Sequence, residues 1–171
     1  MSARNISVLG EGTVSGGQYA DIKIMGTADF LDGVEAKAIR IMGEAVLGAV
    51  KASDIMVAGT ARFKGPVHAD SVKVNGEADF DQTVKAQTFV VNGSIRAVQG
   101  MESEKFIARG NFEANYLNAN DVEIYLAGRS RVREIGGESV RVQTKAWYMF
   151  FHNLFGKHLQ ELAVDTIEAD R

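Results

Sequence analysis

The chain has 171 residues and a mass of 18.5 kDa, which is enough for one domain with its own hydrophobic core. Hydrophobic residues make up 46% of the sequence, too many for a disordered chain, yet no apolar run approaches the ~20 residues of a membrane-spanning helix. The 19 basic and 22 acidic residues nearly balance, which argues against nucleic acid as the main partner, and the lack of cysteine excludes disulfides, thiolate metal sites and cysteine nucleophiles.

Residues 1–5 are expected to form a short polar N-terminal tail. The first twelve residues lack the long apolar stretch of a signal peptide, so a cytoplasmic protein is expected. The 18 glycines and the single proline indicate a β-rich chain, because many turns are needed while almost no backbone N–H can be given up.

A repeat of 16 to 18 residues runs over residues 6–142. Its fullest form reads I-x-I-x-G-x-A-x-F, and a V-x-A signature precedes the next copy. The apolar residues that open the nine copies are Ile6, Ile22, Ile39, Ile55, Val72, Phe89, Phe106, Val122 and Val140. Apolar residues at every second position place successive side chains on opposite faces, as in a β-strand.

These alternating stretches are too short to form a sheet that packs face to face, but they can coil so that each turn lies on the previous one. The sequence therefore predicts an all-β fold, a β-helix (β-solenoid) of about nine turns over residues 6–144. Glycines are expected at its corners. One interior ladder is expected to contain Phe30, Leu47, Phe63 and Phe80.

The repeat is interrupted at residues 145–163, which are rich in aromatic side chains. One interpretation is an inserted helix or lobe packed against a face of the solenoid. The other is a contact patch for a membrane surface or a partner protein, formed by Trp147, Phe150, Phe151 and Phe155. Residues 164–171 return to the V-x-A pattern, from which we expect the sequence to be the front part of a longer solenoid.

The sequence offers no constellation of residues typical of catalysis. His68 alternates outward, and His152 and His158 lie too far apart along the chain to bind one metal from a single helix face. No nucleophile elbow, zinc-protease helix, phosphate loop or dinucleotide loop occurs. The sequence therefore predicts no catalytic, cofactor-binding or metal-binding residue and no enzyme.

The first turn carries the candidate site for self-association. A solenoid ends in strand edges with unpaired N–H and C=O groups, which most solenoids cover with a polar cap. The expected edge for strand addition by another subunit consists of Ile6, Val8, Gly10 and Val14. The alternative is that residues 1–5 fold over this edge.

The 16-to-17-residue turn with its paired glycine and V-x-A signatures, clearest over residues 55–69 and 72–86, resembles the bactofilins, bacterial polymer-forming cytoskeletal proteins. The resemblance covers residues 6–142. It implies a right-handed parallel β-helix and end-to-end assembly into filaments without bound nucleotide. It also implies a scaffold for cell shape, wall synthesis or motility machinery.

The leading hypothesis is therefore a self-assembling scaffold without a cofactor. Its expected partners are further copies of itself, a paralogous bactofilin, and envelope or motility proteins, with attachment to the inner face of the cell membrane a further option. A β-helix that binds proteins without polymerising is the alternative. A left-handed β-helix acyltransferase is a distant third, because its hexapeptide repeat gives turns of eighteen residues, which spacings of 16 and 17 do not fit.

Overall fold

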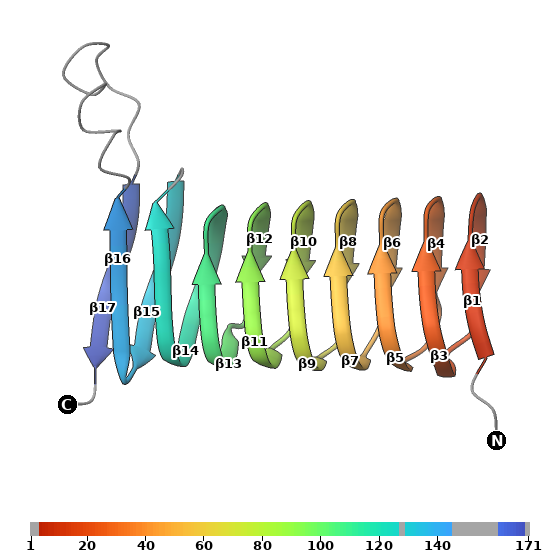
Figure 1. Cartoon of the computed structure of the whole chain (residues 1–171), viewed down its shortest axis with the longest axis horizontal. Helices are drawn as coiled ribbons and strands as arrows, with labels where there is room; N and C mark the ends of the chain where they lie inside the picture. Colours follow the sequence, from red (N-terminus) through yellow and green to blue (C-terminus); the bar gives the residue numbers. More distant parts are fainter. Residues whose placement is uncertain (1–3, 127–128, 145–160, 170–171) are drawn as a thin grey trace, which may run out of the picture.

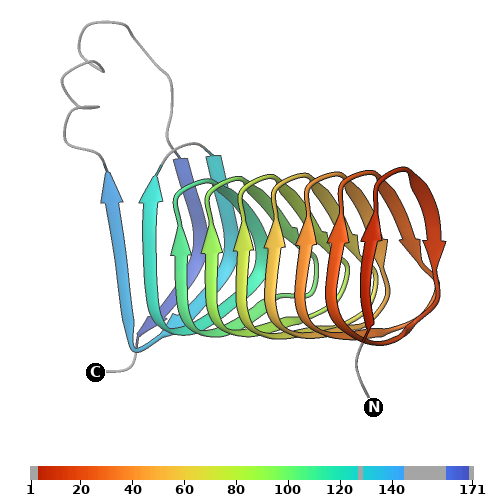
Figure 2. The same cartoon turned by 45° about the vertical axis from the view of Figure 1, so that its right-hand side comes forward.

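The computed structural model describes residues 4–126, 129–144 and 161–169, and all of the secondary structure in these ranges is β-strand. Seventeen strands form one continuous sheet that winds into a rod, with the N-terminal turn at one end and the last strands at the other (Figures 1 and 2). The structure confirms the predicted all-β solenoid. The rod has about eight turns rather than nine, because the copy that starts at Val140 contributes one strand before residues 145–160.

Short and long strands alternate along most of the chain. Their bounds are β1 (Arg4–Val8), β2 (Glu11–Val14), β3 (Gly17–Ile24), β4 (Thr27–Phe30), β5 (Val34–Ile41), β6 (Glu44–Leu47), β7 (Val50–Val57), β8 (Thr60–Phe63), β9 (Val67–Val74), β10 (Glu77–Phe80), β11 (Val84–Val91), β12 (Ser94–Ala97), β13 (Met101–Ala108), β14 (Asn111–Leu126), β15 (Arg129–Gly137), β16 (Ser139–Thr144) and β17 (Glu161–Ala169).

Each strand pairs in parallel with its equivalent one turn away. The register follows the sequence repeat: Ile55 lies opposite Ile39 on one side and Val72 on the other. Equivalent residues therefore form columns along the rod, so one side-chain type at one repeat position produces a continuous ladder.

Inward-facing columns form a single hydrophobic core along the rod. The predicted ladder is confirmed, since Phe30, Leu47, Phe63 and Phe80 are all buried. Farther along the rod, Ala97 occupies the position opposite Phe80, and the large side chains are found in other columns. The buried rings that supply it are Phe89, Phe106 and Phe112. The core thus keeps its volume while its large residues change columns, as close packing requires.

The predicted corner glycines are required by close approach of the backbone. A Cβ on Gly26 would lie 2.0 Å from the carbonyl oxygen of Gly10, and one on Gly43 would lie 2.0 Å from that of Gly26. The same contact, at 1.9–2.1 Å, recurs at Gly59, Gly76, Gly93 and Gly110. No side chain fits at such a distance, so each turn can stack on the previous one only if the corner is glycine.

The predicted helical lobe at 145–163 falls mainly on residues 145–160, which lie outside the described residues. Its last residues are in a strand, because β17 begins at Glu161 and pairs with β15. The chain thus re-enters the sheet ahead of residue 164, the predicted point of return.

Candidate functional site: the N-terminal edge

The first turn of the solenoid presents a sheet edge. Strand β1 pairs with β3, and β2 pairs with β4, each along one side. Within residues 4–126, 129–144 and 161–169, these are the only residue-level pairings of β1 and β2, so no strand pairs with their other side. Alternate N–H and C=O groups of both strands therefore point away from the rod at its N-terminal end, the arrangement that accepts an added strand.

The apolar residues of this edge are less buried than their equivalents one turn later. Ile6 and Val8 are only partly buried, whereas Ile22 and Ile24 opposite them are 1% and 0% exposed. Val14 is likewise only partly buried. The structure thus brings together the residues predicted for the self-assembly edge, and their inner faces form an incompletely covered end of the core.

Gly10 differs from every corner glycine stacked above it. A Cβ on Gly10 would meet no atom within 4 Å, because no described turn lies beneath it. Gly12 stands where later turns have Ala28 and Ala45, and a Cβ there would touch only Val8, at 3.7 Å. Neither glycine is required by contacts with the described residues, so this corner of the first turn is open.

Tyr19 is a feature of this end that the sequence interpretation missed. It occupies the column of Ala36 and Ala52, yet it is buried, and its hydroxyl donates a hydrogen bond to the carbonyl oxygen of Ser15 at 2.7 Å. The signal was an aromatic residue at a position that is alanine in the following turns. Tyr19 thus places a buried aromatic ring in the first part of β3, at the same end of the rod as β1 and β2.

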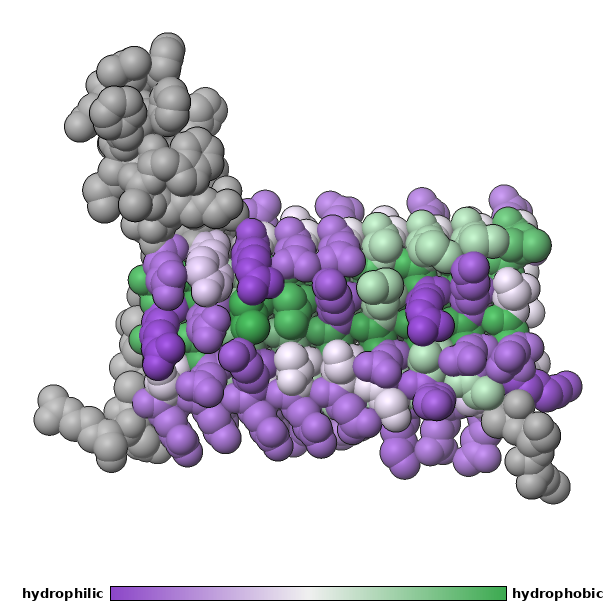
Figure 3. Space-filling view, viewed as in Figure 1, coloured by the Kyte–Doolittle hydropathy of each residue, from purple (hydrophilic) through white to green (hydrophobic). Residues whose placement is uncertain are grey.

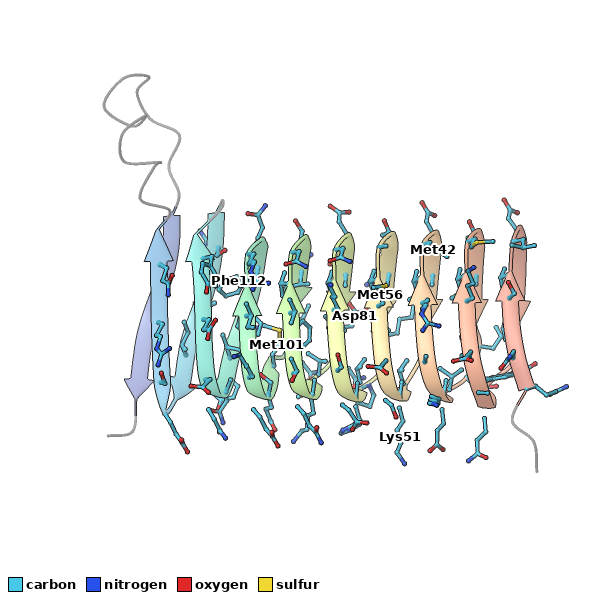
Figure 4. The ribbon with its side chains drawn as sticks, in the orientation of Figure 1. Met42, Lys51, Met56, Asp81, Met101 and Phe112 are labelled. Carbon is cyan, nitrogen blue, oxygen red and sulfur yellow. The ribbon has the colours of Figure 1, made fainter. Side chains whose placement is uncertain are left out.

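A second feature is an open groove of about 480 Å³ on the side of the rod. His68 lies on one wall, between Lys51 and Lys85 in the same column. The flanking lysines pair with carboxylates: Lys51 Nζ lies 3.3 Å from Glu35 Oε1, and Lys85 Nζ lies 2.6 Å from Glu102 Oε2. These side chains are exposed or half-buried, and Lys51 points away from the rod (Figure 4), so the column is a solvated charged face.

Glu35 has a pKa below its ordinary value of 4.5. The first cause is the hydrogen bond that Gln18 Nε2 donates to Glu35 Oε2 at 3.1 Å, and the second is Lys51, which donates a hydrogen bond and adds its positive charge. Both partners stabilise the ionised carboxylate. This shift is explained by neighbours along one exposed column.

The other residues that the sequence singles out are placed as follows. The aromatic residues Trp147, Phe150, Phe151 and Phe155, together with His152 and His158, lie outside the described residues. Among the residues that are described, no group of three or more histidine and acidic side chains could hold a metal ion. No helix in that part of the chain is long and apolar enough to cross a membrane.

The chain was compared with family models, curated proteins and solved structures. None of the three comparisons gives a match.

Proposed function

We propose that this protein is a structural scaffold whose subunits assemble end to end through the N-terminal edge, without nucleotide. The observation that carries the proposal is that an open strand edge and a corner glycine, Gly10, occur together, and the described part of the chain gives no steric reason for this glycine. An added strand from another subunit would satisfy the outward N–H and C=O groups and lie against the open corner.

Assembly would also cover apolar surface. Ile6, Val8 and Val14 are the residues whose inner faces remain partly exposed at this end. Completing the burial of one such side chain contributes at most about 1.5–3 kcal/mol, and the backbone hydrogen bonds add to this. A repeated interface of this kind gives either a closed dimer or an open filament, depending on which ends pair.

We further propose that the protein belongs with the bactofilins, in which case the solenoid is right-handed and the polymer is cytoskeletal. Support comes from the 17-residue turn and from the resemblance carried by residues 55–69 and 72–86. The biological role would be a scaffold for cell shape, the envelope or motility machinery. Purified protein would then form filaments with no nucleotide added.

The test is negative-stain electron microscopy and analytical ultracentrifugation of the purified chain and of Ile6→Lys/Val8→Lys. We expect the unsubstituted chain to form filaments or larger oligomers and the variant to remain dispersed, since two charges would be buried at the junction. Circular dichroism checks that the variant keeps its β structure, and Val8→Lys alone is a milder version. Ser7→Lys is the matched control, because Ser7 is exposed in the same strand.

A protein-binding solenoid that does not polymerise is the second candidate, and the side groove with His68 on its wall is the observation that favours it. The two candidates differ in one measurement. A chain that stays monomeric at high concentration, with Ile6→Lys/Val8→Lys indistinguishable from it, contradicts the polymer and leaves the binding module.

A further inference from the structure

A row of exposed apolar side chains follows one corner of the solenoid from the N-terminal end. We define the apolar strip as Leu9, Met25, Met42 and Ala58, which precede the corner glycines of the first four turns. Met56 adds an exposed apolar side chain next to the strip, in the neighbouring column of Arg40 and Lys73. The exposed fractions are 68% for Leu9, 43% for Met25, 46% for Met42 and 38% for Met56. The row is visible along the upper edge of the N-terminal half in Figure 3, and Figure 4 labels Met42 of the strip and Met56 next to it.

The repeat does not impose this apolar character. The corner position before each glycine is polar in later turns, where Asn92 Nδ2 donates a 2.8 Å hydrogen bond to Asn75 Oδ1. The next residue in the column, Arg109, lies over the ring of Tyr125 at 5.5 Å. The same corner therefore accepts polar and charged side chains, and its apolar half is a separate property of the first four turns. Contiguous exposed apolar surface of this kind is typical of an interaction site.

Charges of opposite sign lie on the two sides of the apolar strip. One side carries Lys23, Arg40 and Lys73, which precede the corner in their turns, with Met56 between Arg40 and Lys73 in the same column. The other side carries Glu11, Glu44 and Glu77, which follow it. All six side chains are exposed, and none forms an ion pair with another residue in the described ranges.

From this arrangement we propose that the apolar strip joins two copies of the chain side by side, pointing in the same direction. A twofold axis parallel to the rod places the basic side of one strip against the acidic side of the other, at equal height. Arg40 then faces Glu44 of the second copy, and Lys73 faces Glu77 of the second copy. An antiparallel pair would instead place basic against basic and acidic against acidic, which is unfavourable.

The contact between the two strips is small, and its size determines how strongly two subunits associate. Stacked strands are about 4.8 Å apart, so the strip from Leu9 to Ala58 is roughly 15 Å long, well short of the ~800 Å² per partner of a stable interface. Two free subunits would associate weakly. If subunits also polymerise end to end, the contact repeats along the filament and the weak pairs reinforce one another. Filament pairing thus rests on the proposed function, whereas pairing of two subunits does not.

The test uses single cysteines, because the chain contains none of its own. About a twofold axis parallel to the rod, every strip residue faces its own equivalent, so Met25→Cys and Met42→Cys should each form a disulfide-linked dimer under mild oxidation. Leu31→Cys is the control, since Leu31 is 70% exposed but lies outside the strip. We expect dimers at least tenfold faster at positions 25 and 42 than at 31, also in the Ile6→Lys/Val8→Lys background. Equal rates at all three positions overturn the proposal.

Charge reversal checks the orientation. In the Met42→Cys chain, Arg40→Glu alone and Glu44→Arg alone should each slow dimer formation severalfold, and the two together should restore it. Failure of the double variant to recover overturns the parallel pair. So does preferential crosslinking of Met25→Cys to Met42→Cys, which indicates an antiparallel pair. Binding of the strip to phosphatidylglycerol vesicles, abolished by Met42→Gln and without crosslinked dimer, assigns the strip to a membrane and likewise overturns the proposal.

The outcomes separate the two proposals. Single filaments with no crosslinking at positions 25 and 42 support end-to-end assembly and contradict the strip. Crosslinked dimers without filaments support the strip and contradict the end-to-end polymer.

Discussion

The rings of Phe63 and Phe80 stack inside the solenoid with their centroids 4.8 Å apart and their planes inclined by 5°. This distance matches the separation of neighbouring strands, about 4.8 Å, so the ring spacing follows directly from the register of β8 and β10. The contact continues through Phe89, whose ring meets that of Phe80 edge to face at 5.9 Å. Aromatic contacts therefore link consecutive turns through the middle of the rod.

Phe80→Ala should lower the free energy of unfolding by about 3–5 kcal/mol, because it leaves a cavity between two turns and removes both ring contacts. Urea unfolding followed by circular dichroism gives the value. Leu31→Ala is the control and should change stability by less than about 0.5 kcal/mol, because Leu31 is 70% exposed. Equal losses for the two variants would show that the ladder is not the stabilising element.

Gly59→Ala and Gly10→Ala change the same corner position in different turns. In Gly59→Ala the new Cβ would lie 2.0 Å from the carbonyl oxygen of Gly43, so we expect a loss of about 3 kcal/mol or more in unfolding free energy. In Gly10→Ala it would meet no atom within 4 Å, so stability should stay within about 0.5 kcal/mol.

Gly10→Ala should affect assembly even though it leaves the stability of the subunit unchanged. Gly10→Ala introduces a methyl group where the proposed junction needs close approach, so filament formation should be slower or lost in light-scattering assays. Unimpaired filaments from a normally stable Gly10→Ala protein would indicate that the added strand does not approach this corner.

Much of the fold was predictable because each repeat position has one structural task. A glycine with a carbonyl oxygen 2.0 Å from its Cβ position tolerates no replacement, so Gly43 and Gly59 are conspicuous in the sequence. The core of the later turns was harder to predict, because large and small residues change columns there. Ala97 stands opposite Phe80, whereas Phe112 stands opposite Ile95 in another column. A small side chain in one column is balanced by a large one in another, so the choice of residue depends on the total volume of the core. The pattern of a single column does not reveal this volume.

The candidate site was only partly predictable. The order of the repeats places Ile6 and Val8 in the first turn, and that is enough to predict an edge. The sequence could not show that Gly10 lacks a neighbour among the described residues or that Tyr19 is buried, since both depend on distances between turns.

Gln18→Leu should raise the pKa of Glu35 toward its ordinary value of 4.5, because the hydrogen bond from Gln18 is the main cause of the shift. A carboxyl whose pKa is lower in the folded chain than in the unfolded chain stabilises the fold at pH values above its unfolded-state pKa. This contribution is lost as the pH falls through its folded-state pKa. An NMR titration of the Glu35 carboxyl checks the shift. Gln82→Leu, at an exposed position in another turn, should leave the pKa of Glu35 as it is.

Ser103→Ala should raise stability by about 1 kcal/mol, because a buried hydroxyl without a hydrogen bond costs free energy that a methyl group does not. Ser103 Oγ is buried and has no partner in the described part of the chain. Its neighbours in the column, Ala86 and Ala119, show that alanine fits there. The reciprocal change, Ala86→Ser, should lower stability by a similar amount in urea unfolding. A less stable Ser103→Ala protein would mean that the hydroxyl has a hydrogen-bond partner in solution.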